Sequence, residues 1–207
     1  MPYIIRPKGA RKFAAALFGT VLLIGAVPAA ANAACPSNPS SALLAQYGDN
    51  AAYSLLPGSS FESGAPGWSL SNAEVVEGSG VDGSSNALAI EPGGVAVSPA
   101  FCVSSEDPSF RFFVRQVSGG GVLNVRLRWM NPRHRWFTSN DIPVGSLQGE
   151  TSWALSPTLE LARKLSLWMP GSTANVELVF ESSKARFEPG PGGAWEIDGV
   201  YIDPYSR

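Results

Sequence analysis

The chain is poor in the residue types that build catalytic and metal centres. Its 207 residues include a single histidine, His134, and two cysteines, Cys35 and Cys102. One histidine leaves too few soft ligands for a zinc site. It is also the sole imidazole available to a Ser-His-Asp triad, and it follows Asn131-Pro132 in a segment typical of a turn between strands. We therefore interpret His134 as a surface residue.

Familiar catalytic motifs are absent as well. The sequence has no GxSxG, no phosphate-binding loop, no dinucleotide fingerprint and no HExxH. Its 17 acidic side chains would allow a glycosidase, which needs two acids about 5 to 10 Å apart. A chain of this length has few residues left to form the walls of a catalytic cleft. We expect no enzyme activity and keep a small glycoside hydrolase as the less favoured alternative.

Long hydrophobic runs are missing except near the N-terminus. Four basic residues between Arg6 and Lys12 precede an apolar stretch from Phe13 to Val27, and Ala31-Asn32-Ala33 follows. This order is typical of a secretory signal peptide with a small-x-small cleavage site. The apolar stretch is shorter than the roughly twenty residues of a membrane span. We expect residues 1–33 to be removed and the protein to be secreted, rather than anchored through this segment or through a lipid on Cys35.

Positive charge is scarce in what remains. The whole chain has 15 basic and 17 acidic side chains, and loss of the four leader cations leaves 11 against 17. This balance argues against binding to nucleic acid or to anionic membranes. Residues 34–207 contain no second run of spanning length, so we expect a soluble protein of one domain with no membrane contact after cleavage.

Both cysteines remain after cleavage. In an oxidising compartment, two cysteines of one small domain usually pair, and a metal-binding pair lacks further soft ligands here. We expect a Cys35–Cys102 disulfide. It would tie residues 34–52, a tail rich in Ser, Pro, Ala and Asn, to the domain at 53–207.

From Tyr53 onward, short apolar runs with β-branched and aromatic residues are interrupted by Gly, Pro, Ser and Asn every eight to twelve residues. This rhythm predicts an all-β protein built as a β-sandwich. The segment 158–168 is ambiguous between helix and strand. The predicted strands are 53–56, 59–62, 67–70, 73–77, 86–91, 94–98, 109–116, 121–130, 135–139, 153–161, 174–181 and 194–203.

Two strands alternate clearly enough for their faces to be assigned. In 121–130 the apolar set Leu123, Val125, Leu127 and Trp129 is expected in the core, which leaves Asn124, Arg126, Arg128 and Met130 outside. In 109–116 the residues expected in the core are Phe110, Phe112 and Val114. Their neighbours Arg111, Phe113 and Arg115 are expected on a solvated face, with Phe113 exposed.

Two separated stretches resemble a known group of folds. Residues 57–68, with Phe61-Glu62 followed by Gly67-Trp68, resemble the opening strand of galactose-binding-like jelly rolls, which include families of carbohydrate-binding modules. Trp195-Glu196-Ile197-Asp198-Gly199-Val200-Tyr201-Ile202 resembles their closing strand, and Leu88-Ala89-Ile90 and Ala96-Val97-Ser98-Pro99 fit two strands between. Residues 53–204 also resemble a set of secreted actinobacterial proteins of uncharacterised function, with Phe101-Cys102-Val103 and Asp203-Pro204-Tyr205 in matching places. The resemblance implies a jelly-roll β-sandwich.

The resemblance also implies a structural calcium ion. In the better-known relatives, a first-strand Glu and a last-strand Asp help to bind it, and Glu62 and Asp198 stand at those positions. Two carboxylates with loop carbonyls are suitable ligands for calcium. Gly199 replaces a second Asp that the relatives often have. The alternative is that Glu62 and Asp198 only hydrogen-bond to nearby backbone.

These observations favour a secreted, non-catalytic binding module, for carbohydrate at the cell envelope or outside the cell. The alternative is a structural or adhesive envelope protein that binds another protein. Six of the cations fall between Arg111 and Arg135, so the solvated faces of two strands are locally basic. Guanidinium groups beside a ring suit sugar hydroxyls and carboxylates, although these arginines could instead pair with acids of neighbouring strands. The predicted ligand-binding residues are Arg111, Phe113, Arg115, Asn124, Arg126 and Arg128.

Overall fold

The computed structural model describes residues 35–36, 39–81, 83–129, 140–149, 151–167, 171–184, 190 and 192–203. The predicted signal peptide, His134 and the predicted strand 135–139 lie outside the described residues. The described elements are a single-turn 3-10 helix η1 (Ala45–Tyr47) and the strands β1 (Ser54–Leu55), β2 (Ser69–Glu77), β3 (Asn86–Val97), β4 (Phe101–Ser104), β5 (Ser109–Ser118), β6 (Val122–Trp129), β7 (Asn140–Leu147), β8 (Ala154–Leu155), β9 (Leu159–Glu160), β10 (Thr173–Ser183) and β11 (Ala194–Asp203).

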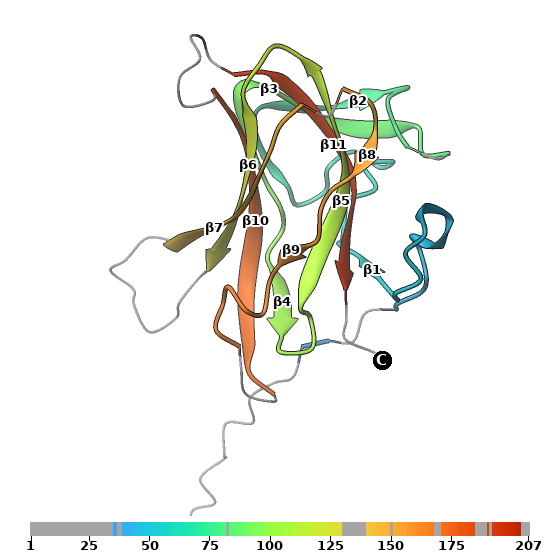
Figure 1. Ribbon diagram of the computed structural model, residues 1–207, viewed down its shortest axis with the longest axis vertical. Coiled ribbons are helices and arrows are strands. Elements are labelled where there is room, and N and C mark those ends of the chain that lie inside the picture. Colours follow the sequence, from blue (N-terminus) through green and yellow to red (C-terminus); the bar gives the residue numbers. More distant parts are fainter. Residues whose placement is uncertain are drawn as a thin grey trace, which may run out of the picture. The chain divides into compact units, whose positions relative to one another are not determined.

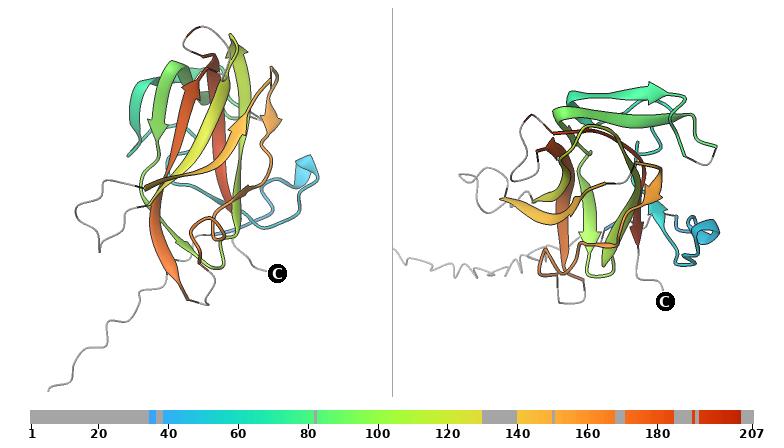
Figure 2. Two further views of the ribbon diagram at one scale, coloured as in Figure 1. Left: turned by 60° about the vertical axis from the view of Figure 1, so that its left-hand side comes forward. Right: turned by 45° about the horizontal axis from the view of Figure 1, so that its top comes forward.

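The strands form one antiparallel sheet that folds over itself into two layers (Figures 1 and 2). One layer contains β5 and β11, with β1 paired to β11 and the short strands β8 and β9 paired to β5. The other contains β7, β6 and β10, with β4 paired to β10. β3 belongs to both layers, since its first half pairs with β11 and its second half with β10. The predicted all-β sandwich is confirmed.

The bend in β3 falls at Glu91-Pro92-Gly93-Gly94. Gly94 is required there because a Cβ at this position would lie 2.2 Å from the carbonyl oxygen of Asn72 on β2. β2 follows β3 through the bend, with an irregular register between Ser71 and Ala73. The predicted strand pairs 67–70 with 73–77, and 86–91 with 94–98, are therefore each one bent strand.

The core between the layers contains the residues that alternation predicted. Phe110, Phe112 and Val114 enter it from β5, and Leu123, Val125 and Leu127 enter it from β6; all six are fully buried, and Trp129 packs partly against them. The two strands lie in opposite layers and both direct these side chains inward. Their alternate residues consequently point outward on opposite sides of the sandwich.

Two of the predicted strands are wrong, and the strands β4 and β7 were not predicted. Residues 59–62 form a turn, in which Phe61 has a left-handed backbone with φ of 55°. Strand 153–161 is two short strands separated at Ser156-Pro157, and the described part of 158–168 continues as a turn closed by a hydrogen bond from the Leu165 N–H to the Leu161 carbonyl. β7 was not predicted because Pro143 and Gly145 interrupt its alternation, which an edge strand with a bulge at this point tolerates.

The predicted disulfide between Cys35 and Cys102 is confirmed. It joins the N-terminal part of the domain to β4, across 67 residues of sequence. The described part of the chain contains no helix with the length and apolar character that a membrane span requires.

A candidate binding pocket between the N-terminal strap and the sheet

Residues 41–53, which we call the strap, cover part of the outer face of the β5–β11 layer. The strap is closed on itself by an antiparallel bridge between Ser41 and Tyr53. Leu44 and Tyr53 from the strap form a second apolar cluster with Phe113 of β5, separate from the main core. Phe113 points outward, as alternation predicts, but is 4 % exposed because the strap covers it. The prediction that Phe113 is exposed is therefore wrong, and residues 41–53 pack on the sheet as well as following the disulfide-tied Cys35.

One carboxylate anchors the strap to the sheet. Asp49 Oδ2 accepts a hydrogen bond from the Tyr53 hydroxyl at 2.7 Å and pairs with Arg111 Nη1 of β5 at 2.8 Å. Burial would raise the pKa of Asp49, but hydrogen bonds from Tyr53, the Ala51 amide and Arg111 outweigh it and lower the pKa. Burial and the bond to Asp49 raise the pKa of Tyr53 to about 12. The Asp49 contacts therefore stabilise the folded protein at neutral pH. This stabilisation is lost as the pH falls through the lowered pKa of Asp49.

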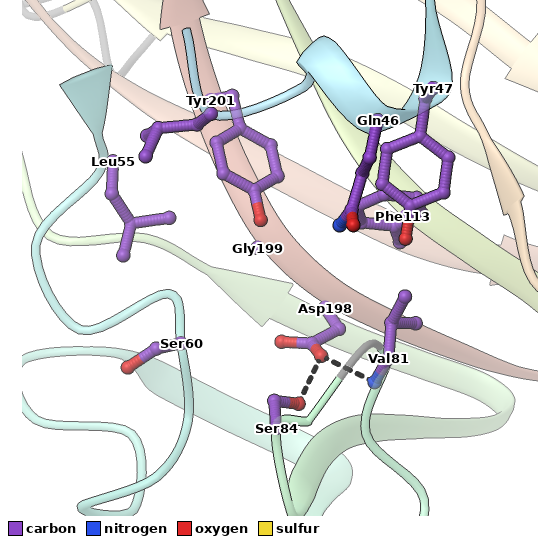
Figure 3. A pocket seen from close by; sticks show the side chains of 11 residues that line it. Gln46, Tyr47, Leu55, Ser60, Val81, Ser84, Phe113, Asp198, Gly199 and Tyr201 are labelled. Atoms are coloured by element: carbon purple, nitrogen blue, oxygen red, sulfur yellow. Dashed lines mark hydrogen bonds between the residues drawn. The ribbon is translucent and has the colours of Figure 1, made fainter. Parts of the chain in front are cut away.

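A pocket of about 180 Å³ opens where the strap meets the sheet and two neighbouring loops (Figure 3). Its walls come from parts of the chain far apart in sequence: the strap, β1, the turn after β1, the loop between β2 and β3, β5 and β11. The lining residues are Leu43, Gln46, Tyr47, Leu55, Ser60, Val81, Ser84, Phe113, Asp198, Gly199 and Tyr201.

Aromatic rings form one side of the pocket. The Tyr47 ring packs on Phe113 with ring centres 4.7 Å apart, and Phe113 meets Tyr201 edge-on at 6.1 Å. The planar amide of Gln46 lies beside Tyr47 and Phe113 (Figure 3). Flat rings beside planar hydrogen-bonding groups provide a stacking surface together with directional polar contacts.

The floor of the pocket carries a buried carboxylate. Asp198 Oδ2 accepts a hydrogen bond from the Ser84 hydroxyl at 2.6 Å and another from the Val81 N–H at 3.0 Å. Its other oxygen is turned away from these two donors (Figure 3). Burial raises the pKa of Asp198, against the lowering effect of the hydrogen bonds, and the nearby charge of Glu62 adds to the rise.

Gly199 makes room for Tyr201. β11 has an irregular register between Asp198 and Val200, and Gly199 there has a left-handed φ of 51°. A Cβ on Gly199 would lie 2.5 Å from the hydroxyl oxygen of Tyr201 and 2.7 Å from its ring. The ring therefore occupies the space into which a longer side chain at position 199 would extend.

The rim of the pocket is apolar and exposed. Among the described residues, the exposed large hydrophobic side chains are Leu43, Tyr47, Leu55 and Val117, at 42 %, 39 %, 39 % and 53 %. The first three all line this pocket. A gathering of exposed apolar side chains around a hollow with a polar floor is a mark of a binding site.

The six predicted ligand-binding residues do not share one face. Asn124, Arg126 and Arg128 lie on the outside of the β6–β10 layer. There Arg126 pairs with Asp141 and Glu181, and Arg128 pairs with Asp141 and Glu177. The Asn124 amide donates to the Ser183 hydroxyl at 2.6 Å. The ion-pair alternative therefore describes these arginines, since acids of both neighbouring strands neutralise them.

The other three predicted residues lie on the opposite side, on β5. Arg111 is bound to Asp49, as described above. Arg115 donates to Glu196 and to the Ser79 hydroxyl and lies 4.9 Å from the centre of the Trp153 ring. Phe113 alone of the six lines the pocket. The single basic binding face that the sequence suggested is thus two separate surfaces.

The two residues predicted to bind calcium converge on the loop between β2 and β3. Glu62 Oε1 accepts hydrogen bonds from the N–H groups of Ser85 and Asn86 at 2.7 and 2.9 Å, while Asp198 binds Ser84 and Val81. Each carboxylate uses one oxygen in these contacts. No group of three or more His, Cys, Asp or Glu side chains arranged to hold a metal occurs among the described residues.

Most of the pocket was not visible to sequence reasoning. Tyr47 and Gln46 lie in a segment whose composition predicts a tail, and Tyr201 lies within the family-like closing strand but was not predicted to line a site. The short apolar piece 42–45, followed by Tyr47 and Tyr53, was the available signal that this segment packs on something.

No protein-family model matches the chain, and no curated protein resembles it in sequence. Solved structures do resemble it. The CBM22-2 xylan-binding domain of Paenibacillus barcinonensis Xyn10C matches with a TM-score of 0.50 and 17 % identity, over 70 % of this chain and 97 % of that one. The CBM22-1–GH10 modules of Clostridium thermocellum xylanase Xyn10B, complexed with xylohexaose, match with a TM-score of 0.51 and 13 % identity, over 72 % of this chain and 28 % of that one. The chain thus has the jelly-roll fold of carbohydrate-binding modules, as the resemblance implied.

Proposed function

We propose that this protein is a secreted, non-catalytic carbohydrate-binding module that holds its ligand in the pocket under the strap. The observation that carries the proposal is the composition of that pocket: the exposed Tyr47 and the half-buried Tyr201 supply rings, while Gln46 and Asp198 supply planar polar groups. Sugar rings have apolar C–H faces and many hydroxyl groups, so they match rings and planar hydrogen-bonding side chains together.

Binding fits the pocket better than hydrolysis does. Of the described residues that line it, Asp198 alone carries a carboxyl group. A glycosidase needs two acids flanking the bond that it cleaves. Secretion is supported by the leader pattern and by the disulfide, which persists in an oxidising compartment.

The proposal is tested on a glycan array, followed by titration calorimetry of the hits. Tyr47→Ala should weaken binding of the hit glycan by about tenfold or more, because it removes the exposed ring. Tyr47→Phe keeps the ring and should retain most of the affinity. Melting curves of both variants establish that they are folded.

Two results would contradict the proposal. An array without any hit, combined with capture of a protein partner that Tyr47→Ala abolishes, would favour the adhesive alternative. Equal affinity of Tyr47→Ala and the parent for a glycan would place the sugar elsewhere on the surface, and the outer face with Arg126 and Arg128 would be tested next.

We also propose a structural calcium ion at Glu62 and Asp198. The two carboxylates reach the same loop, and main-chain carbonyls and water would have to supply the remaining oxygen ligands, of which calcium takes six to eight. When bound, the ion would fix this loop against the sheet.

Removal of calcium should then lower the melting temperature. A calcium concentration about a hundredfold above the dissociation constant corresponds to a change of roughly 5 to 10 °C for a domain of this size. Asp198→Asn should abolish the response to EDTA, whereas Glu77→Gln, an exposed carboxylate at the end of β2, should leave it intact. An EDTA-insensitive parent would show that hydrogen bonds alone hold the loop.

A further inference from the structure

The rim of the pocket contains two side chains that sugar stacking does not explain. Leu43 of the strap and Leu55 of β1 are about 40 % exposed, at 42 % and 39 %. Both line the pocket, alongside the Tyr47 ring. A branched aliphatic side chain has no flat face to offer a sugar ring. It is complementary to a methyl group, because contact between two apolar groups removes their surfaces from water and is favourable.

The volume of the pocket limits what can enter it. At about 180 Å³ it is smaller than the roughly 300 to 1,000 Å³ of pockets for drug-sized ligands. The strap forms one wall and the sheet with its loops forms the others (Figure 3). A hollow of this size admits one sugar unit, so a longer glycan would have to present its end.

We propose that the pocket recognises a terminal sugar unit that carries a methyl-bearing substituent, such as an acetamido, O-methyl or 6-deoxy group. Leu43 and Leu55 contact the methyl carbon, and the polar floor at Asp198 takes the ring hydroxyls. The inference rests on the proposed function, because it assumes that this pocket is the glycan site.

Paired monosaccharides test the inference directly. Glucose, galactose and mannose are each compared with their 6-deoxy and 2-acetamido-2-deoxy forms by calorimetry or by ligand-observed NMR. For at least one of the three hexoses, the methyl-bearing form should bind about fourfold more tightly for each methyl group buried. An oligosaccharide ending in that form should bind no more tightly than the single unit.

Variants separate the leucines from the rest of the pocket. The double substitution Leu43→Ala and Leu55→Ala should remove the preference, so that the methyl-bearing form binds no more tightly than the parent hexose does to the same variant. Val117→Ala, an exposed aliphatic residue of β5 outside the pocket lining, is the matched control and should preserve the preference.

The outcomes distinguish the two proposals. Hexoses that bind with no preference for their methyl-bearing forms overturn the inference and leave the proposed function standing. An affinity that rises with chain length also overturns it, since the pocket would then be part of an extended site. A protein that binds none of these sugars overturns the inference, and one that also binds nothing on the glycan array overturns both.

Discussion

Phe113→Ala should lower the free energy of unfolding by about 3 kcal/mol, the lower end of the cost of removing a buried phenylalanine. The ring is 4 % exposed and lies between the sheet and the strap, in contact with Tyr47 and Tyr201. Its loss leaves a cavity under the strap and removes the contact that holds Tyr47 against the sheet. Urea unfolding followed by tryptophan fluorescence measures the change.

Val117→Ala is the control for this prediction. Val117 lies on the same strand, two positions beyond Arg115, but is 53 % exposed. Its truncation should cost less than about 0.5 kcal/mol, as is usual for surface positions. If both variants lose the same small amount, the strap does not cover Phe113 in solution and residues 41–53 are a loose tail.

Phe113 also shows which parts of the fold could be predicted from the sequence and which could not. Alternation along 109–116 correctly separates inward from outward residues, because successive side chains of a strand point to opposite faces and Phe112 and Val114 are fully buried. Alternation does not predict which other segment of the chain covers the outward face. A segment 60 or more residues away in sequence covers it, and no local pattern encodes that contact.

The expectation that the six predicted ligand residues share one face is wrong for a related reason. Strand parity is correct for both β5 and β6, but it does not say whether two strands belong to the same layer. A jelly roll connects consecutive strands across the sandwich, so Arg111 and Arg126 point outward on opposite sides. Their acidic partners, Asp49 and Glu181, come from other parts of the chain.

The family-like motifs carry long-range geometry that strand alternation does not. Glu62 and Asp198 are 136 positions apart, yet the resemblance implies that they lie in one site, and their hydrogen bonds to residues between Val81 and Asn86 show that both reach the same loop. The departure from the motif, Gly199, is explained by the structure alone: the Tyr201 ring occupies the space that a second aspartate would need.

The largest effect on binding is expected from Gly199→Ala. The new Cβ would lie 2.5 to 2.7 Å from the hydroxyl and ring of Tyr201, so the ring must leave its present position on the pocket wall. Binding of the glycan identified on the array should fall below detection, about a hundredfold or more, because both the ring and the space beside Asp198 change. The backbone cost of a non-glycine residue at a φ of 51° adds about 1 kcal/mol of instability.

Gly93→Ala separates the binding effect from the backbone cost. Gly93 has a φ of 77° at the bend of β3, and a Cβ there would meet no atom within 4 Å. This variant should therefore lose about the same 1 kcal/mol of stability and bind glycan as the parent does. If Gly199→Ala is folded and binds with the affinity of the parent, Tyr201 does not form part of the site. If Gly93→Ala loses binding as well, the loss follows from instability, and the position of the pocket must be tested through Tyr47 alone.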